Sequence, residues 1–180
     1  KKKRVLLIDG DLRHGSTSML VGSPGEGLSD YLNGRTDDLE GIICHGEDHG
    51  LVEGFDVLPI GTMPPNPTEL LFTDRLGEMI KQVRGEYDYV LIDCPPVEIV
   101  ADTQIIEKLA DRTIFVVRSG LMQRSMLGDI EQIYKDKKFK NMSLILNGTK
   151  AQGGRYGHYY RYGYHYGYGY GYHYGSDKNG

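Results

Sequence analysis

Val90-Leu91-Ile92-Asp93-Cys94-Pro95-Pro96 predicts a buried β-strand that ends in a carboxylate. Tyr89 precedes the apolar run, and the two prolines stop the strand because proline cannot donate a ladder hydrogen bond. In open α/β sheets, ligands bind outside the carboxyl ends of the strands. Asp93 is therefore expected at the edge where such a protein holds its ligand.

A second run near the N-terminus has the same pattern. The apolar strand Val5-Leu6-Leu7-Ile8-Asp9 is followed by Gly10-Asp11-Leu12-Arg13. Two strands that each end in aspartate predict carboxylates that meet at one edge of a sheet. Mg²⁺ is usually held by one or two carboxylates together with phosphates, so a metal–phosphate site is one explanation. The alternative is that each aspartate only caps the helix that follows it.

Length and charge exclude some classes of protein. The 180 residues suffice for one α/β domain with a sizeable core. Residues 1–150 hold 18 basic and 24 acidic side chains, a formal charge of −6, whereas the last thirty residues carry +2. The negative charge of residues 1–150 argues against a general nucleic-acid-binding protein.

The cellular setting is indicated by several smaller features. The two cysteines, Cys44 and Cys94, fit no metal-binding spacing, and so few indicate a reducing compartment. No apolar run approaches the ~20 residues of a membrane span, and the sequence shows no signal peptide. It starts with Lys1-Lys2-Lys3-Arg4 directly against a strand and without a Met. We expect the chain to belong to something longer.

Strands and helices are predicted to alternate along the chain. Apolar runs predict strands at residues 4–9, near 42–43, and at 55–60, 89–93, 113–117 and 142–146. Helical spacing and caps predict helices at residues 16–21, 27–34, 66–83, 101–110 and 123–137. Such alternation favours an α/β fold, a parallel sheet flanked by helices. Right-handed crossovers would then gather Asp9, Asp93, Arg118 and Asn147 at one edge.

Two of these helices have detailed predictions. In the helix at 66–83, Asn66 is the cap, Pro67 the first residue, and an apolar stripe runs from Phe72 to Val83. In the helix at 123–137, the predicted inner stripe runs from Met126 to Tyr134.

The composition changes abruptly after Lys150. Residues 153–175 contain only Gly, Tyr, His and Arg, and no aliphatic side chain is present to build a core. We therefore interpret the tail as disordered. It holds ten tyrosines: Tyr156, Tyr159, Tyr160, Tyr162, Tyr164, Tyr166, Tyr168, Tyr170, Tyr172 and Tyr174.

Taken together, these motifs resemble the bacterial tyrosine kinases, P-loop-type kinases that regulate export of capsular and extracellular polysaccharides. The segment Val5 to Arg13 matches the family's second Walker-like motif, an apolar strand followed by D-x-D-x-R. Val90 to Pro95 matches its Walker B form, and the segments Pro64 to Leu71 and Leu144 to Gly148 look like further family segments. The tyrosine-rich tail is the feature that separates these kinases from their relatives.

One family motif is absent from the sequence. The Walker A loop, G-x-x-x-x-G-K-[ST], should lie just upstream of the first strand and supply the phosphate cradle, a lysine and a Mg²⁺-binding hydroxyl. Judging from the family, its strand belongs near the middle of the sheet. Residues 1–150 are thus expected to be a partial deviant-Walker kinase domain, and residues 151–180 a flexible tyrosine cluster. This segment alone is expected to be inactive.

The resemblance also implies roles for individual residues. Asp11 and Asp93 would hold Mg²⁺, directly or through water, and Asp9 would orient or deprotonate the acceptor tyrosine. Arg13 would contact phosphate or a neighbouring subunit, unless it forms a surface ion pair. Asn147 would touch the adenine of ATP, although Asn before Gly is also ordinary turn chemistry. The ten tail tyrosines would be the phosphoacceptors.

The implied activity is that of an ATP- and Mg²⁺-dependent tyrosine autokinase that controls polysaccharide synthesis and export. Its tail would be phosphorylated by a neighbouring subunit within a ring held by tail-in-site contacts. A membrane adaptor segment and a tyrosine phosphatase would be partners, nucleic acid would not, and the location would be the cytoplasmic side of the bacterial inner membrane.

Two other classes of protein stay open. A deviant-Walker ATPase of the cell-division or plasmid-partition type shares the aspartate motifs but transfers phosphate to water, which needs no tyrosines. A non-catalytic assembly protein could use the Gly-Tyr tail as a sticky segment.

Overall fold

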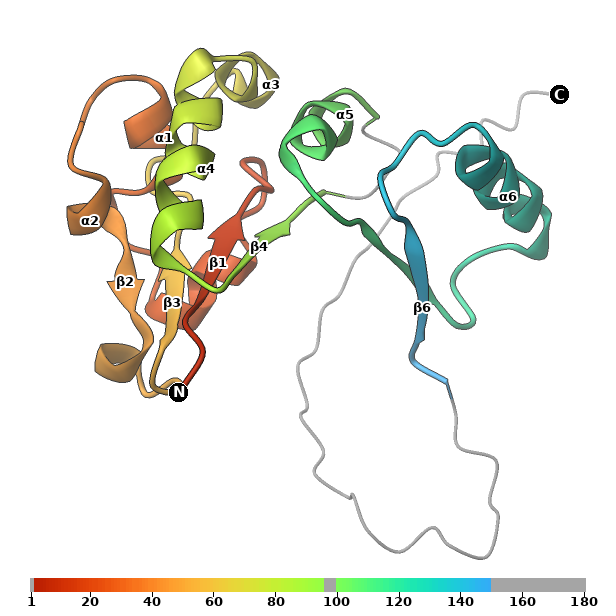
Figure 1. Cartoon of the computed structure of the whole chain (residues 1–180), viewed down its shortest axis with the longest axis horizontal. Coiled ribbons are helices and arrows are strands. Elements are labelled where there is room, and N and C mark those ends of the chain that lie inside the picture. Colours follow the sequence, from red (N-terminus) through yellow and green to blue (C-terminus); the bar gives the residue numbers. More distant parts are fainter. Residues whose placement is uncertain (1, 96–99, 150–180) are drawn as a thin grey trace, which may run out of the picture.

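The computed structural model describes residues 2–95 and 100–149, which contain two β-sheets (Figure 1). The larger sheet has the order β2 (Cys44–His45), β3 (Phe55–Leu58), β1 (Val5–Asp9) and β4 (Tyr89–Asp93). β3, β1 and β4 are parallel, and the short β2 is antiparallel to β3. The smaller sheet pairs β5 (Ile114–Arg118) with β6 (Ser143–Asn147) in parallel. The tyrosine tail and its predicted disorder lie outside the described residues.

The helices connect these strands. The α-helices are α1 (Leu28–Leu32), α2 (Leu39–Ile42), α3 (Pro67–Leu71), α4 (Asp74–Glu86), α5 (Val100–Leu109) and α6 (Leu127–Lys135). The 3₁₀-helices are η1 (Thr17–Val21), η2 (Gly46–His49) and η3 (Arg124–Met126). The predicted α/β class is confirmed. None of the helices in residues 2–95 and 100–149 combines the length and the hydropathy that a membrane span requires.

The main core lies between one face of the larger sheet and the helices that connect its strands. Leu6 and Ile8 of β1 are buried there, and Val90 and Ile92 of β4 pack against the same cluster. From α4 come the buried side chains Leu76, Met79, Ile80 and Val83. Burying one such side chain contributes about 1.5–3 kcal/mol, so this face fixes the position of β1 relative to β4.

Two local predictions are wrong. The strand expected near residues 42–43 starts later, because Ile42 belongs to α2, whose N-cap Asp38 accepts the N–H of Gly41 at 3.0 Å. The single helix expected at 66–83 is broken into α3 and α4. Thr73 interrupts it, donating its hydroxyl to the carbonyl of Leu70 at 2.8 Å and then serving as N-cap of α4. Phe72, predicted in the apolar stripe, is 65% exposed.

The prediction that Asp9, Asp93, Arg118 and Asn147 gather at one sheet edge is wrong. Within the described ranges, β4 pairs only with β1, and β5 pairs only with β6. Asp9 and Asp93 therefore meet at one sheet, whereas Arg118 and Asn147 meet at the other. Predicted helix 123–137 is divided into η3 and α6, and the described residues of α6 include no buried one.

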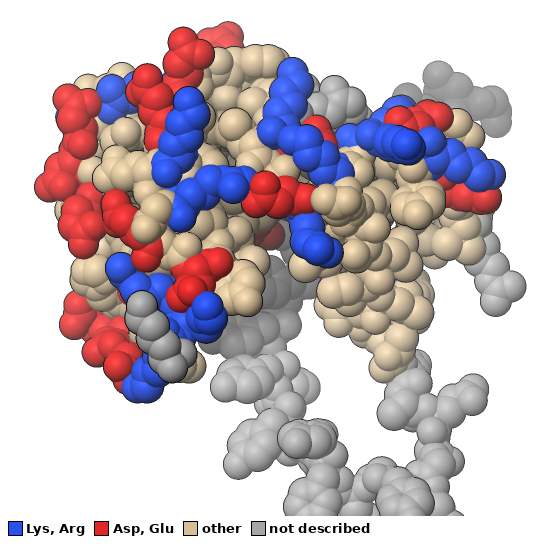
Figure 2. All heavy atoms as spheres, in the orientation of Figure 1, with Lys and Arg blue, Asp and Glu red and all other residues tan. Residues whose placement is uncertain are grey.

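Large apolar side chains are exposed on β4, at the border of the larger sheet, and on both strands of the smaller sheet. Leu91 of β4 is 45% exposed, and Ile114 and Val116 of β5 are 57% and 58% exposed. Leu144, Ile145 and Leu146 of β6 are exposed as well. Figure 2 shows the surface around β6 as an area without charged side chains, in contrast to the acidic edge over α2 and β2. Exposed apolar surface of this extent is typical of an interface with another segment.

A tight corner joins the end of β3 to α1 and supports the loop after β1. Gly61 has a φ of +75°, and a Cβ there would lie 2.2 Å from the nitrogen of Gly27. The buried Asp30 accepts N–H groups from Gly27 at 3.1 Å and Thr62 at 2.9 Å. The corner therefore requires glycine at position 61 for both backbone conformation and space.

We expect Gly61→Ala to lower the free energy of unfolding by at least ~2 kcal/mol, because it combines backbone strain with a clash against backbone atoms. Urea unfolding measures this effect. The control is Gly85→Ala, because Gly85 is exposed in α4 and a Cβ there meets no atom of the described residues within 4 Å. That change should raise the free energy by about 0.5–1 kcal/mol. A Gly61→Ala protein as stable as the wild type would contradict this account of the corner.

Candidate functional site

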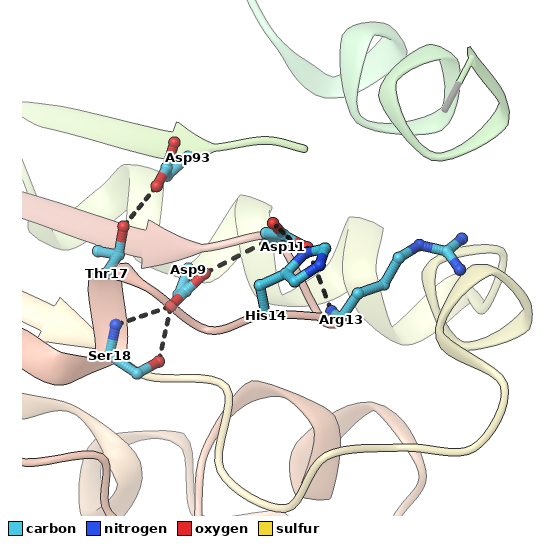
Figure 3. A network of polar contacts seen from close by, with 7 residues as sticks. All are labelled: Asp9, Asp11, Arg13, His14, Thr17, Ser18 and Asp93. Atoms are coloured by element: carbon cyan, nitrogen blue, oxygen red, sulfur yellow. Dashed lines mark hydrogen bonds and ion pairs between the residues drawn. The ribbon is translucent and has the colours of Figure 1, made fainter. Parts of the chain in front are cut away.

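The carboxyl ends of β1 and β4 bring two aspartates side by side. Asp9 and Asp93 are Cα partners in the parallel ladder. Gly10 donates its N–H to the carbonyl oxygen of Asp93 at 2.8 Å, which keeps the two strands together beyond their last residues. Figure 3 shows both carboxylates at this edge, with Asp11 in the turn that follows β1.

The Asp9 carboxylate is held from inside the protein. Its exposed fraction is 0%, and Ser18 donates both its N–H and its hydroxyl to Oδ2 at 2.7 Å. The N–H of Asp11 donates to Oδ1 at 3.3 Å. Burial raises the pKa of Asp9, the hydrogen bonds from Ser18 and Asp11 oppose that rise, and the Asp93 charge adds to it. Asp9 therefore lies beneath the edge, where it contacts the loop that carries Asp11.

Asp11 is fixed by the turn that it begins. Its residue exposure is 8%, and its Oδ1 accepts the N–H of Arg13 at 3.2 Å. The Nδ1 atom of the exposed His14 lies 3.0 Å from Oδ2. Backbone N–H groups of His14 and Gly15 bond to the carbonyl of Asp11. The carboxylate is thus oriented by its own loop.

Asp93 is the exposed member of the group. The hydroxyl of Thr17 donates to its Oδ2. Since Thr17 lies in η1, directly before Ser18, neighbouring hydroxyls contact the carboxylates at the ends of both strands (Figure 3). A bound cation could replace the hydroxyl of Thr17 at this carboxylate or bind beside it. Asp93 therefore remains available to a ligand.

The oxygens at this edge fit Mg²⁺ bound together with phosphates. Asp11 and Asp93 offer hard carboxylate ligands, and Mg²⁺ typically takes one or two carboxylates and completes its shell with water and phosphate oxygens. Among residues 2–95 and 100–149, no group of three or more His, Cys, Asp or Glu side chains could hold a metal by itself. Asp11 and Asp93 therefore suit a metal that is also bound by phosphate and water, and not a metal enclosed by protein ligands alone.

The side chains of two other predicted site residues lie apart from the carboxylates. Arg13 extends away from them in Figure 3, and its guanidinium donates to the hydroxyl of Thr68 in α3 at 2.8 Å. Asn147 ends β6 opposite Arg118 in the smaller sheet, where its Oδ1 accepts the N–H of Gly148 at 2.7 Å. Of the predicted residues, the structure brings Asp9, Asp11 and Asp93 together. The ten tail tyrosines lie outside the described residues.

Thr17 and Ser18 were missed by sequence reasoning. The available signal was the run Ser16-Thr17-Ser18, which places hydroxyls shortly after a strand that ends in aspartate. Which hydroxyl meets which carboxylate depends on how the intervening loop returns over the sheet, and no local pattern encodes that. Cys94, which directly follows Asp93, is half-buried, and burial raises the pKa of its thiol to about 12. Such a thiol is a poor nucleophile at neutral pH.

Known proteins similar to this chain were found by sequence. No family model matches it. It is 37% identical over 161 residues to the tyrosine-protein kinase wzc of Salmonella typhimurium, covering 87% of this chain and 22% of that protein. It is 33% identical over 158 residues to the tyrosine-protein kinase CpsD of Streptococcus agalactiae, covering 87% of this chain and 67% of CpsD. The chain thus spans about a fifth of the first relative and two thirds of the second.

Solved structures give the same result for the fold. The kinase domain of the Escherichia coli tyrosine kinase ETK superposes with a TM-score of 0.72 at 34% identity, covering 88% of this chain and 61% of that one. The septum site-determining protein MinD of Pyrococcus horikoshii, solved with Mg-ADP, gives a TM-score of 0.58 at 26% identity, covering 80% and 57%. These are P-loop NTPase folds, and the kinase superposes better.

Proposed function

Because this chain belongs to the bacterial tyrosine kinases, we propose that it is the C-terminal part of an ATP-dependent protein-tyrosine autokinase. The observation that carries the proposal is the group of Asp9, Asp11 and Asp93 at the carboxyl ends of two adjacent parallel strands. By resemblance to its family, the parent protein regulates synthesis and export of an exopolysaccharide or capsule.

The aspartates would divide the work of phosphoryl transfer. When bound, Mg²⁺ neutralises phosphate charge as the phosphoryl group of ATP passes to the tyrosine oxygen. Asp11 and Asp93 would hold it, because they are the two carboxylates nearest the open edge. The phenolic proton has an ordinary pKa near ~10 and must leave during transfer. Asp9 would assist by orienting the acceptor side of the site; its burial favours action through its neighbours.

The phosphate-binding loop would come from a strand that inserts between β4 and β5. Among the described residues, β4 and β5 each pair with one strand only, and a parallel strand between them would join the two sheets into one. Its insertion would also place a phosphate loop beside Asp93, since the carboxyl ends of parallel strands share one edge. This strand would carry the Walker A motif that the sequence lacks.

The handedness rule selects the face on which the accompanying helix would lie. The connection from β3 through α4 to β4 passes over β1, and α4 covers the face of Leu6 and Ile8. A strand beyond β4 that connects back to β1 crosses in the opposite direction, so a right-handed crossover lies on the opposite face. That is the face to which the exposed Leu91 points, since it alternates with Val90 and Ile92.

The ten tail tyrosines would be the phosphoacceptors, modified mainly by a neighbouring subunit. Glycines let the tail pass through a narrow cleft, and closely spaced tyrosines make the register unimportant. Each phosphate adds about −1.5 to −2 charges at neutral pH, which would repel the body with its formal charge of −6. The unmodified tail would then hold a ring of subunits together, and the phosphorylated tail would leave.

The test of this proposal mixes two variants of the full-length protein. One carries Asp93→Asn and an intact tail, and the other has a working site but ends at Gly154. Phosphotyrosine, read by immunoblot and mass spectrometry, should appear on the first variant at a level within a few-fold of the wild type. If wild-type protein is labelled and the mixture is not, transfer between subunits is wrong.

Location and partners follow from the same resemblance. The parent protein would act at the cytoplasmic side of the bacterial inner membrane, joined to a membrane adaptor segment and dephosphorylated by a tyrosine phosphatase.

The second candidate function is that of an ATPase, which the likeness to MinD, solved with Mg-ADP, supports. The labelling experiment separates the two, because an ATPase would release phosphate and leave the tail unmodified.

A further inference from the structure

Ser18, which was not among the predicted site residues, makes three hydrogen bonds at the site. It is 4% exposed, and both its N–H and its hydroxyl donate to Oδ2 of Asp9 at 2.7 Å. Its hydroxyl oxygen also accepts the N–H of Ile60 at 2.8 Å. One small side chain therefore joins η1, the end of β1 and the segment after β3.

Asp9 connects Ser18 to the loop that holds Asp11. The oxygen opposite the one that Ser18 contacts accepts the N–H of Asp11 at 3.3 Å. The path from Ser18 through the Asp9 carboxylate to the Asp11 backbone consists of hydrogen bonds between buried groups (Figure 3). Such a path is stiff, because breaking any part leaves a buried polar group without its partner.

The contact with Ile60 gives the path a fixed base. Ile60 precedes Gly61, whose close approach to Gly27 locks the corner between β3 and α1. On the other side of Ser18, Thr17 contacts Asp93. Ser18 thus stands between the rigid corner and the carboxylates at the ends of both β1 and β4.

We propose that Ser18 is a positioning residue that orients Asp9 and, through it, the loop that presents Asp11 to the metal. Its role in the reaction rests on the proposed kinase function, but its effect on the loop does not. Without the hydroxyl, the N–H of Ile60 loses its acceptor and Asp9 loses a donor. The Asp11 loop would then sample other conformations, and metal binding would weaken although the nucleotide contacts are unchanged.

The first experiment uses the chain of residues 1–180 and amide hydrogen exchange by NMR. In Ser18→Ala, the amides of Ile60 and Asp11 should exchange at least tenfold faster than in the wild type, while the amide of Leu6 in β1 does not change. The matched control is Ser16→Ala, because Ser16 is exposed and its side chain does not cap η1. Unchanged exchange at Ile60 and Asp11, or equal acceleration at Leu6, would overturn the proposal.

The second experiment asks whether the effect reaches the metal in the full-length kinase. Ser18→Ala should raise the Mg²⁺ concentration for half-maximal autophosphorylation at least fivefold while the KM for ATP stays within twofold. Ser18→Thr, which keeps a hydroxyl, should restore the Mg²⁺ response, and Ser16→Ala should leave it unchanged. A merely structural residue would lower the active fraction without moving the Mg²⁺ midpoint. An unmoved midpoint would therefore overturn the positioning role, whereas a wild type without kinase activity would refute the proposed function and leave the exchange result standing.

Discussion

Asp93→Asn in the full-length protein should reduce autophosphorylation at least ~100-fold, which corresponds to about 2.7 kcal/mol of transition-state stabilisation. The change removes one carboxylate charge from the pair proposed to hold Mg²⁺. Asparagine keeps an oxygen that can accept the hydroxyl of Thr17, so the contact to η1 can survive. Since Asp93 is exposed, the free energy of unfolding should stay within ~0.5 kcal/mol of the wild type.

A matched variant controls for the loss of a negative charge. Asp37→Asn removes an exposed carboxylate that pairs with Arg75 at 2.8 Å, outside the proposed site. Its autophosphorylation should equal that of the wild type, because a surface ion pair contributes little. Both variants are measured by phosphotyrosine formation over time, with urea unfolding alongside. Near-normal activity of Asp93→Asn would remove Asp93 from the site.

The parts of the fold that the sequence predicts best are those with a strong local signal. The strands at β1 and β4 are uninterrupted apolar runs, and both observed strands end at the aspartate that was expected to end them. The break at Thr73 was harder to foresee, because the apolar spacing continues across it. A threonine that bonds back to Leu70 competes with the helix, and spacing alone does not reveal which wins.

The candidate site divides in the same way. Asp9, Asp11 and Asp93 could be named from sequence because strand ends in a parallel sheet share an edge. Their difference in exposure could not, since Asp9 is buried by Ser18 and by the return of η1 over the sheet. Asn147 was expected at the same edge. It lies in the smaller sheet, because within the described residues β4 pairs only with β1 and β5 only with β6.

The second large effect concerns nucleotide affinity. Residues 1–180 should bind Mg–ATP no tighter than about 1 mM, worth only ~4 kcal/mol, because the sequence lacks the glycine-rich loop and lysine that cradle phosphates. Asp11 and Asp93 alone would repel the phosphates unless Mg²⁺ lies between them. A version extended upstream to include a Walker A strand and loop should bind at least 100-fold more tightly. The helix that connects its extra strand to β1 would also cover the exposed Leu91.

Isothermal titration of Mg–ATP into these two forms tests the central claim most directly. The account predicts no binding tighter than about millimolar for residues 1–180, and binding at about 10 μM or below for the extended form, a difference of at least ~2.7 kcal/mol. Micromolar binding by residues 1–180 would contradict it, because the described residues would then form a complete nucleotide site without an inserted strand.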